Sequence, residues 1–116
     1  KGVIKGLIEM FPDLEVELQA IVDRLVDLQP VTRANYYHPD MLGSWSIKAV
    51  LPTIAPDMDY ALLEGIKVGT DASAAYLQAI DPGTSEEKRE AIRADLLRYC
   101  RHDTAAMVRL VRFFSG

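Results

Sequence analysis

Residues 84–114 read TSEEKREAIRADLLRYCRHDTAAMVRLVRFF, and this stretch decides the fold class of the chain. It opens with a capping box, because Thr84 is followed three residues later by Glu87 and the two side chains can satisfy backbone N–H groups at a helix start. The helix that begins there can run to about Phe114. About thirty helical residues span about 45 Å, so we expect a kink or a break in so small a domain.

The apolar side chains of this predicted helix gather on one face. At 100° per residue they fall within a single arc, which we expect to face the core. Asp103 lies inside the same arc, and Tyr99 lies at its edge one turn earlier. A carboxylate turned toward a core is costly unless it is paired, hydrogen-bonded or bound to a metal. Two interpretations of Asp103 therefore stay open: a metal ligand, or a structural acid that forms a buried ion pair or caps another helix. The arc consists of Ile92, Leu96, Cys100, Met107, Leu110, Val111 and Phe114.

Four arginines gather within about 80° on the opposite side of the same helix. The whole chain has a formal charge of −4, which argues against a protein that coats nucleic acid generally, but residues 86–116 hold 7 basic and 5 acidic side chains. The arginine stripe is therefore either an ordinary solvated face or a surface that contacts phosphates. It consists of Arg98, Arg101, Arg109 and Arg112.

Prolines and glycines divide the remaining residues into shorter helices. We expect helices over about 3–11, 13–29, 46–51 and 71–80, with a short segment near 60–64, and one short strand is conceivable at 25–31. The predicted N-caps are Asp13, then Ser44 or Ser46, then Thr70 or Asp71. The prediction is a mainly α fold of five to seven helices with little or no sheet, in a single helical domain over residues 1–116.

The composition places the chain among folded proteins. With 49% hydrophobic and 26% charged residues it is neither disordered nor of low complexity. No apolar run approaches the ~20 residues that cross a bilayer, so we expect no membrane partner and a cytoplasmic location. The first helix has no capping residue and no initiator methionine before it. We therefore expect this chain to be a fragment of a longer protein.

The cysteine and histidine residues give no support to a zinc site. Cys100 is the single cysteine, which excludes an internal disulfide, and its place beside Leu96 favours a small buried hydrophobic residue over a nucleophile. His38 and His102 lie far apart in the chain and belong to no paired zinc motif.

The long helix also carries a pattern known from nucleases. Tyr99-x-x-x-Asp103 resembles the third motif of the tyrosine-type DEDD exonucleases, a ribonuclease-H-like group. Further stretches, taken together, resemble a bacterial family catalogued as domain of unknown function twenty-seven seventy-nine, over nearly all of the chain. Its members look like long proteins in which a RecB-like or Cas4-like nuclease region precedes this region. The stretches are Phe11-Pro12-Asp13-Leu14, Arg24-Leu25-Val26-Asp27-Leu28, Tyr37-His38-Pro39, Gly43–Pro52, Ala72–Tyr76 and Tyr99–Thr104.

This resemblance implies the C-terminal, helical part of a ribonuclease-H-like α/β nuclease that acts on nucleic acid phosphodiesters. In such enzymes four carboxylates hold two magnesium or manganese ions. Asp103 would be the fourth carboxylate, and Tyr99 would orient the attacking water. The first two acidic motifs and the central sheet would lie upstream of Lys1, so we expect this chain to be inactive alone and to bind no metal tightly. The resemblance also covers Asp27, for which a role in a turn is favoured.

An alternative function is a non-catalytic helical interaction module. In that case the arginine stripe and the region of Tyr36, Tyr37 and His38 bind a partner, and Asp103 is structural. Under the nuclease hypothesis, helix faces meant to cover the missing N-terminal sheet region would be exposed or would form a homodimer, so we expect a large apolar surface patch.

Overall fold

The computed structural model describes all 116 residues and confirms a mainly α fold. Helices account for 76% of the chain and there is no strand. No helix combines the length and the apolar character that a membrane span requires. The elements in chain order are α1 (Gly2–Met10), η1 (Pro12–Leu14), α2 (Glu15–Arg24), α3 (Leu28–Asn35), η2 (Pro39–Met41), α4 (Ile47–Ile54), η3 (Pro56–Met58), η4 (Tyr60–Leu62), α5 (Gly69–Ile80) and α6 (Glu86–Phe114), where η marks 3-10 helices.

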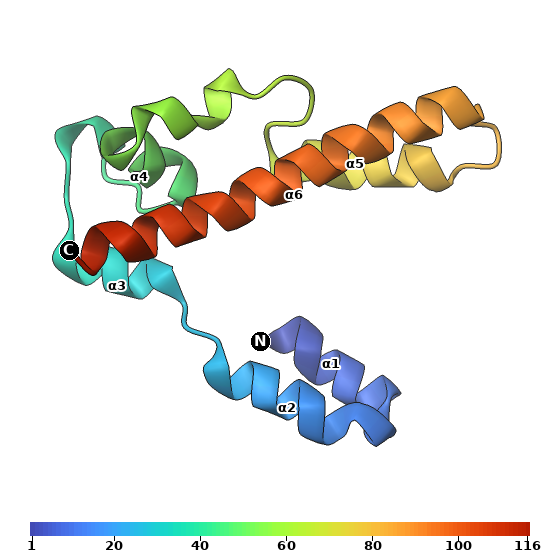
Figure 1. The fold of residues 1–116 in the computed structure, drawn as a ribbon, viewed down its shortest axis with the longest axis horizontal. Helices are drawn as coiled ribbons and strands as arrows, with labels where there is room; N and C mark the ends of the chain where they lie inside the picture. The colour runs from blue at the N-terminus through green and yellow to red at the C-terminus, as the bar shows by residue number, and fades with distance from the viewer.

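Helix α6 is the long central helix against which α3, α4 and α5 pack, and the molecule around it is elongated. Figure 1 shows α5 alongside its first half, α3 and α4 around its second half, and the α1–α2 hairpin extending away from this body. The Cα radius of gyration is 17.2 Å, whereas a compact domain of about this length has about 13 Å. Only 11 residues are buried, and large apolar side chains such as Val3, Met10 and Val16 are exposed on the hairpin.

The kink or break predicted for α6 is wrong, since the helix is continuous over 29 residues and Figure 1 shows no sharp bend along it. A helix of that length spans about 43 Å, and the longest dimension of the molecule is 46 Å. A straight helix fits because the molecule is elongated around it rather than globular.

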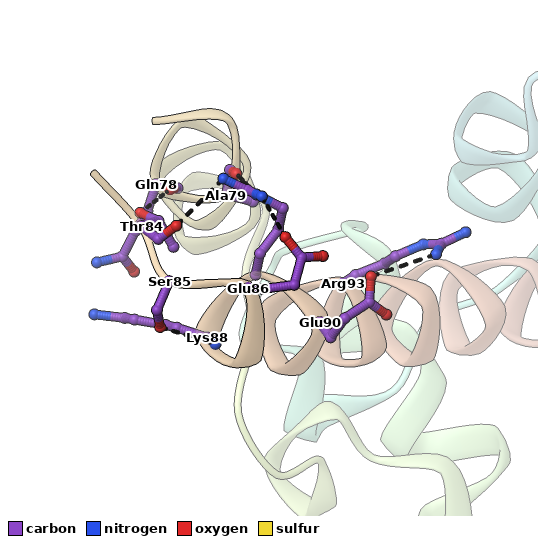
Figure 2. Close-up of polar contacts among 9 residues, drawn as sticks. Gln78, Ala79, Thr84, Ser85, Glu86, Lys88, Glu90 and Arg93 are labelled. Carbon is purple, nitrogen blue, oxygen red and sulfur yellow. Dashed lines mark hydrogen bonds and ion pairs between the residues drawn. The ribbon is translucent and has the colours of Figure 1, made fainter. Parts of the chain in front are cut away.

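The start of α6 also differs from the predicted capping box. Ser85, not Thr84, is the N-cap and accepts from the Lys88 backbone N–H at 3.4 Å. The Thr84 hydroxyl instead donates to the Gln78 carbonyl at 2.6 Å, across the turn from α5 (Figure 2). The turn thus uses the threonine to tie two helices together, which the local spacing of residues could not indicate.

One arginine joins both sides of this turn. The Nε atom of Arg89 donates to the Ala79 carbonyl at 2.9 Å, and one of its terminal nitrogens donates to the Thr84 carbonyl at 3.2 Å. Its other terminal nitrogen pairs with Glu86 at 2.6 Å. Carbonyls at the end of α5 lack intrahelical partners, so this guanidinium satisfies backbone groups that the turn leaves free.

Two small apolar cores attach the other elements to α6. The first joins α4, the η4 region and the middle of α6, and the second joins η2, α4 and the end of α6. Ala106 is fully buried in the first core, where its small side chain lets α4 come close to α6. The buried members are Leu51, Ala55, Tyr60, Ile66, Tyr99 and Ala106 in the first core, and Met41, Val50 and Leu110 in the second.

The buried face of α6 is rotated from the predicted arc. Tyr99 and Ala106 lie at its centre, while Cys100, Met107 and Val111 are exposed. The arc was predicted from hydrophobicity alone, but this helix is apolar on more than one side. Contacts from α4 and α5 select which side is buried.

The N-terminal half departs from prediction in its helix boundaries. Residues 25–27 separate α2 from α3 as extended chain, and the predicted strand at 25–31 is absent. Asp27 is the N-cap of α3 and accepts from the Gln29 backbone N–H at 3.0 Å, which fits the turn role favoured for it. Pro30 lies in the first turn of α3, where its missing N–H costs no helical bond. Of the predicted N-caps, Ser46 is confirmed in position, whereas Asp13 lies within η1 and α5 begins after Val68, before Thr70 and Asp71.

Candidate functional site

The carboxylate of Asp103 lies between α6 and η4. Its Oδ1 accepts a hydrogen bond from the Tyr60 hydroxyl, which reaches it from the short 3-10 helix. Asp59 caps that helix by accepting a hydrogen bond from the Ala61 backbone N–H at 2.9 Å, so the helix begins at Tyr60. Tyr60 is 4% exposed, and Asp103 is partly buried. The acid thus has a specific neutral partner from a distant part of the sequence.

Tyr99 lies one helical turn before Asp103 and faces the same core. It is 9% exposed, and its ring centroid is 6.4 Å from that of Tyr60. Its hydroxyl also lies against Gly69, at the start of α5, where an added Cβ would be 4.0 Å away. The predicted pairing of Tyr99 and Asp103 on one face of α6 is therefore present in the structure.

Both tyrosines have a raised pKa. Burial is the main cause for Tyr60, and its hydrogen bond to Asp103 adds to it, so its pKa lies well above the ordinary value of 10.0. Burial also raises the pKa of Tyr99, and the negative charge of Asp103 raises it further. A phenol of ordinary pKa is already protonated at neutral pH, so the raised pKa values extend the protonated range of both side chains to more alkaline pH.

Two basic side chains lie near Tyr60 without pairing with Asp103. His102 makes a 2.8 Å hydrogen bond from Nε2 to the Met58 carbonyl, and its ring meets that of Tyr60 edge-on at 4.7 Å. The Nζ atom of Lys48 lies 5.7 Å from the centroid of the Tyr60 ring. No Lys, Arg or His nitrogen comes within 4.0 Å of the Asp103 carboxylate. The buried ion pair considered for Asp103 is therefore absent, and so is a helix cap, because its partner is a phenol.

The residues of this chain do not complete a metal site. No three histidine, cysteine, aspartate or glutamate side chains gather closely enough to hold an ion. Asp103 offers one carboxylate, which fits a single corner of a magnesium or manganese centre whose other oxygen ligands come from elsewhere.

The other sequence candidates are scattered over the surface. Cys100 is exposed, so its predicted burial is wrong. His38 accepts from the Asp40 backbone N–H at 3.2 Å in a local turn. Arg98 forms an ion pair with Asp95 at 3.0 Å. The other three arginines of the predicted stripe form no ion pair.

Sequence reasoning missed Tyr60. It lies in a segment without helical periodicity, so no pattern marked it as buried. The Asp59-Tyr60 pair does carry one local signal, because an aspartate that can cap a short helix fixes the direction of the residue after it. That signal gives no partner, and the contact with Asp103 arises only in the folded chain.

Comparison with known proteins gives one match. Residues 1–46 are similar to the family described as Domain of unknown function (DUF2779). No curated protein and no solved structure matches the chain. The match spans α1 to η2 and ends before Tyr60, Tyr99 and Asp103. It supports the expected family resemblance for the N-terminal region and says nothing about the activity of the site.

Proposed function

We propose that this chain is the helical C-terminal portion of a metal-dependent, DEDD-type nuclease that acts on nucleic acid phosphodiesters. In this proposal Asp103 is a ligand to magnesium or manganese, and Tyr99 orients the attacking water. The observation that supports it is a partly buried carboxylate that has a hydrogen-bonded phenol beside it and no cationic partner.

The missing positive charge is the first step of the argument. A carboxylate that loses part of its hydration is stabilised by a cation, a hydrogen bond or a metal. Asp103 receives a hydrogen bond on Oδ1 from Tyr60, and no basic side chain pairs with it. A divalent cation bound at Oδ2 would supply the charge that the protein does not.

The two tyrosines give the second step. Tyr60 holds the Asp103 carboxylate in one orientation, which a metal ligand requires. Tyr99 lies one helical turn before Asp103 on the same face of α6, so its hydroxyl can position a water molecule beside that carboxylate. Bound metal ions in a two-metal site would activate that water and stabilise the leaving oxygen.

Substitutions in the full-length protein test this proposal. Asp103→Asn keeps an acceptor for Tyr60 but removes the charge, so it should eliminate most magnesium-dependent cleavage of an oligonucleotide while leaving the melting temperature nearly unchanged. Tyr99→Phe should slow cleavage by roughly 10²-fold, the scale for one positioned group. Asp95→Asn is the matched control, because Asp95 is an acid of the same helix that pairs with Arg98 instead. An Asp103→Asn protein that cuts at the wild-type rate contradicts the proposal.

The interaction module remains a second candidate because of one observation. Helix α1 contains no buried residue, and α1 and α2 expose apolar side chains that suit a partner protein. The coding sequence upstream of Lys1 discriminates between the two. An Asp-x-Glu motif after a predicted strand favours the nuclease, and an independent helical domain in that place favours the module.

A further inference from the structure

One end of this acidic protein has a net positive charge. Residues 28–56 and 104–116 form α3, η2, α4 and the last part of α6, which pack together around the second core. They carry Arg33, Lys48, Arg109 and Arg112 against a single acid, Asp40, although the chain as a whole has a charge of −4. This end is therefore the part of the protein suited to an anionic ligand.

A hollow of about 240 Å³ lies at this end between α4 and α6. Ile54, Arg109, Arg112 and Phe113 line it. Arg109 and Arg112 lie three residues apart, so they project from neighbouring turns on one side of α6. Neither guanidinium pairs with a carboxylate, in contrast to Arg89, Arg93 and Arg98 earlier in the helix. Two free guanidinium groups beside one hollow suit a phosphate.

The aromatic wall of the hollow is held in place from behind. Phe113 meets the Tyr36 ring edge-on at 5.4 Å, and the Tyr36 hydroxyl is hydrogen-bonded to Thr53 Oγ1 at 2.9 Å. Figure 1 shows the C-terminal end of α6 next to α3, the element that leads to Tyr36. Phe113 nevertheless keeps 47% of its surface exposed. A fixed and half-exposed ring next to two arginines is the combination on which unpaired nucleobases stack.

We propose that this hollow binds one nucleotide of a single-stranded nucleic acid, with its phosphate on Arg109 and Arg112 and its base against Phe113. The choice of nucleic acid as the ligand rests on the proposed nuclease function. Phe113 lies ten residues after Asp103, or about 15 Å along the helix. The hollow therefore holds a different nucleotide from the one that meets Asp103, and it lies on another side of α6, because Arg112 follows Asp103 by nine residues, or half a turn in direction.

Binding without metal tests this site separately from cleavage. The full-length protein is titrated in EDTA with a fluorescent single-stranded oligonucleotide over a range of salt concentrations. Arg109→Gln with Arg112→Gln should weaken binding and reduce the slope of log K against log salt by about 0.7, because both guanidinium groups contact one phosphate and each phosphate contact on a single strand contributes about 0.7. Arg93→Gln with Arg98→Gln is the control with the same change in charge on the same helix, and it should leave the slope nearly unchanged.

The base contact has its own readout. Phe113→Ala should weaken binding by roughly 5- to 150-fold, the range for one stacked base. Since this change can also loosen the end of α6, photo-crosslinking of the wild-type protein to a halogenated-uracil oligonucleotide provides a second measurement, with an adduct expected at Phe113.

Equal weakening in the two arginine double variants, or an adduct only outside residues 109–114, overturns the site. Equal competition by an acidic peptide or by a duplex also overturns it. A protein that binds as expected here but does not cleave with magnesium refutes the nuclease and leaves this site standing.

Discussion

Replacing Tyr60 by phenylalanine tests the contact on which the candidate site depends. The substitution removes only the hydroxyl that donates to Asp103. The ring remains, together with its packing in the first core and its edge-on contact with His102. The effect on stability therefore reports the hydrogen bond and little else.

The structure sets the size of this effect. A hydrogen bond to a charged group contributes about 1.5–3 kcal/mol when buried, and Asp103 is only partly buried, so we expect a loss of about 1–2 kcal/mol. Unfolding entropy of about 2.1 cal/mol/K per residue converts this loss into a decrease in Tm of about 4–8 °C for a chain of this length.

Urea and thermal unfolding of wild-type, Tyr60→Phe, Asp103→Ala and the double variant form a double-mutant cycle for this pair, because alanine removes the acceptor that asparagine would keep. We expect a coupling free energy of about 1 kcal/mol between the two sites. Tyr76→Phe is the matched control, because Tyr76 is 56% exposed and makes no side-chain hydrogen bond. A Tyr60→Phe protein as stable as the Tyr76→Phe control, with no coupling to position 103, would refute the geometry on which the site is built.

Three further predictions concern other parts of the structure. The raised pKa values of Tyr60 and Tyr99 mean that the folded state holds these phenol protons more tightly than the unfolded state. The contribution of these two groups to the free energy of unfolding should therefore be constant below pH 10 and should fall as pH rises above 10. Urea unfolding at pH 8 and pH 10.5 should show a smaller loss of stability in Tyr60→Phe than in wild type. Arg89→Lys loses the forked contacts to two carbonyls across the α5–α6 turn and should lower the free energy of unfolding in urea by about 1–2 kcal/mol. Arg93→Lys changes a 3.7 Å surface ion pair and should lower it by less than about 0.5 kcal/mol. Equal losses in the two variants would contradict the role of Arg89 in the turn. Cys100 should react with a thiol reagent in the native protein at a rate close to that in urea, because it is exposed, and strong protection would show that α6 is buried on this side.

Local chemistry was sufficient to predict most of the helices, although α3 (Leu28–Asn35) was not predicted. Proline and glycine positions divide the chain, and the 3.6-residue spacing of apolar side chains favours helix over strand, because both act through neighbours in the sequence. The end of α5 near Asp81-Pro82-Gly83 and the span of α6 to Phe114 agree with these signals. The N-cap residues were harder to predict, since several polar residues near each helix start could act as the N-cap.

Part of the candidate site was also predictable. Tyr99 and Asp103 lie four residues apart, and any α-helix places such residues on one face. The apolar residues around them placed Asp103 on the predicted core face and Tyr99 at its edge, whereas in the structure Tyr99 lies at the centre of the buried face. The partner of Asp103 did not, because Tyr60 is far away in sequence and no local pattern connects the two.

The tertiary structure alone decided which face of α6 is buried. The sequence determined a long helix with apolar residues on more than one side, and hydrophobicity could not choose between those sides. Side-chain size determines which side packs: the small Ala106 allows α4 to pack closely against α6, and Tyr99 fills the space near the start of α5. Cys100 and Met107 were left exposed as a result. Burial depends on which surfaces meet when distant segments pack, and that is a property of the whole fold rather than of any stretch of sequence.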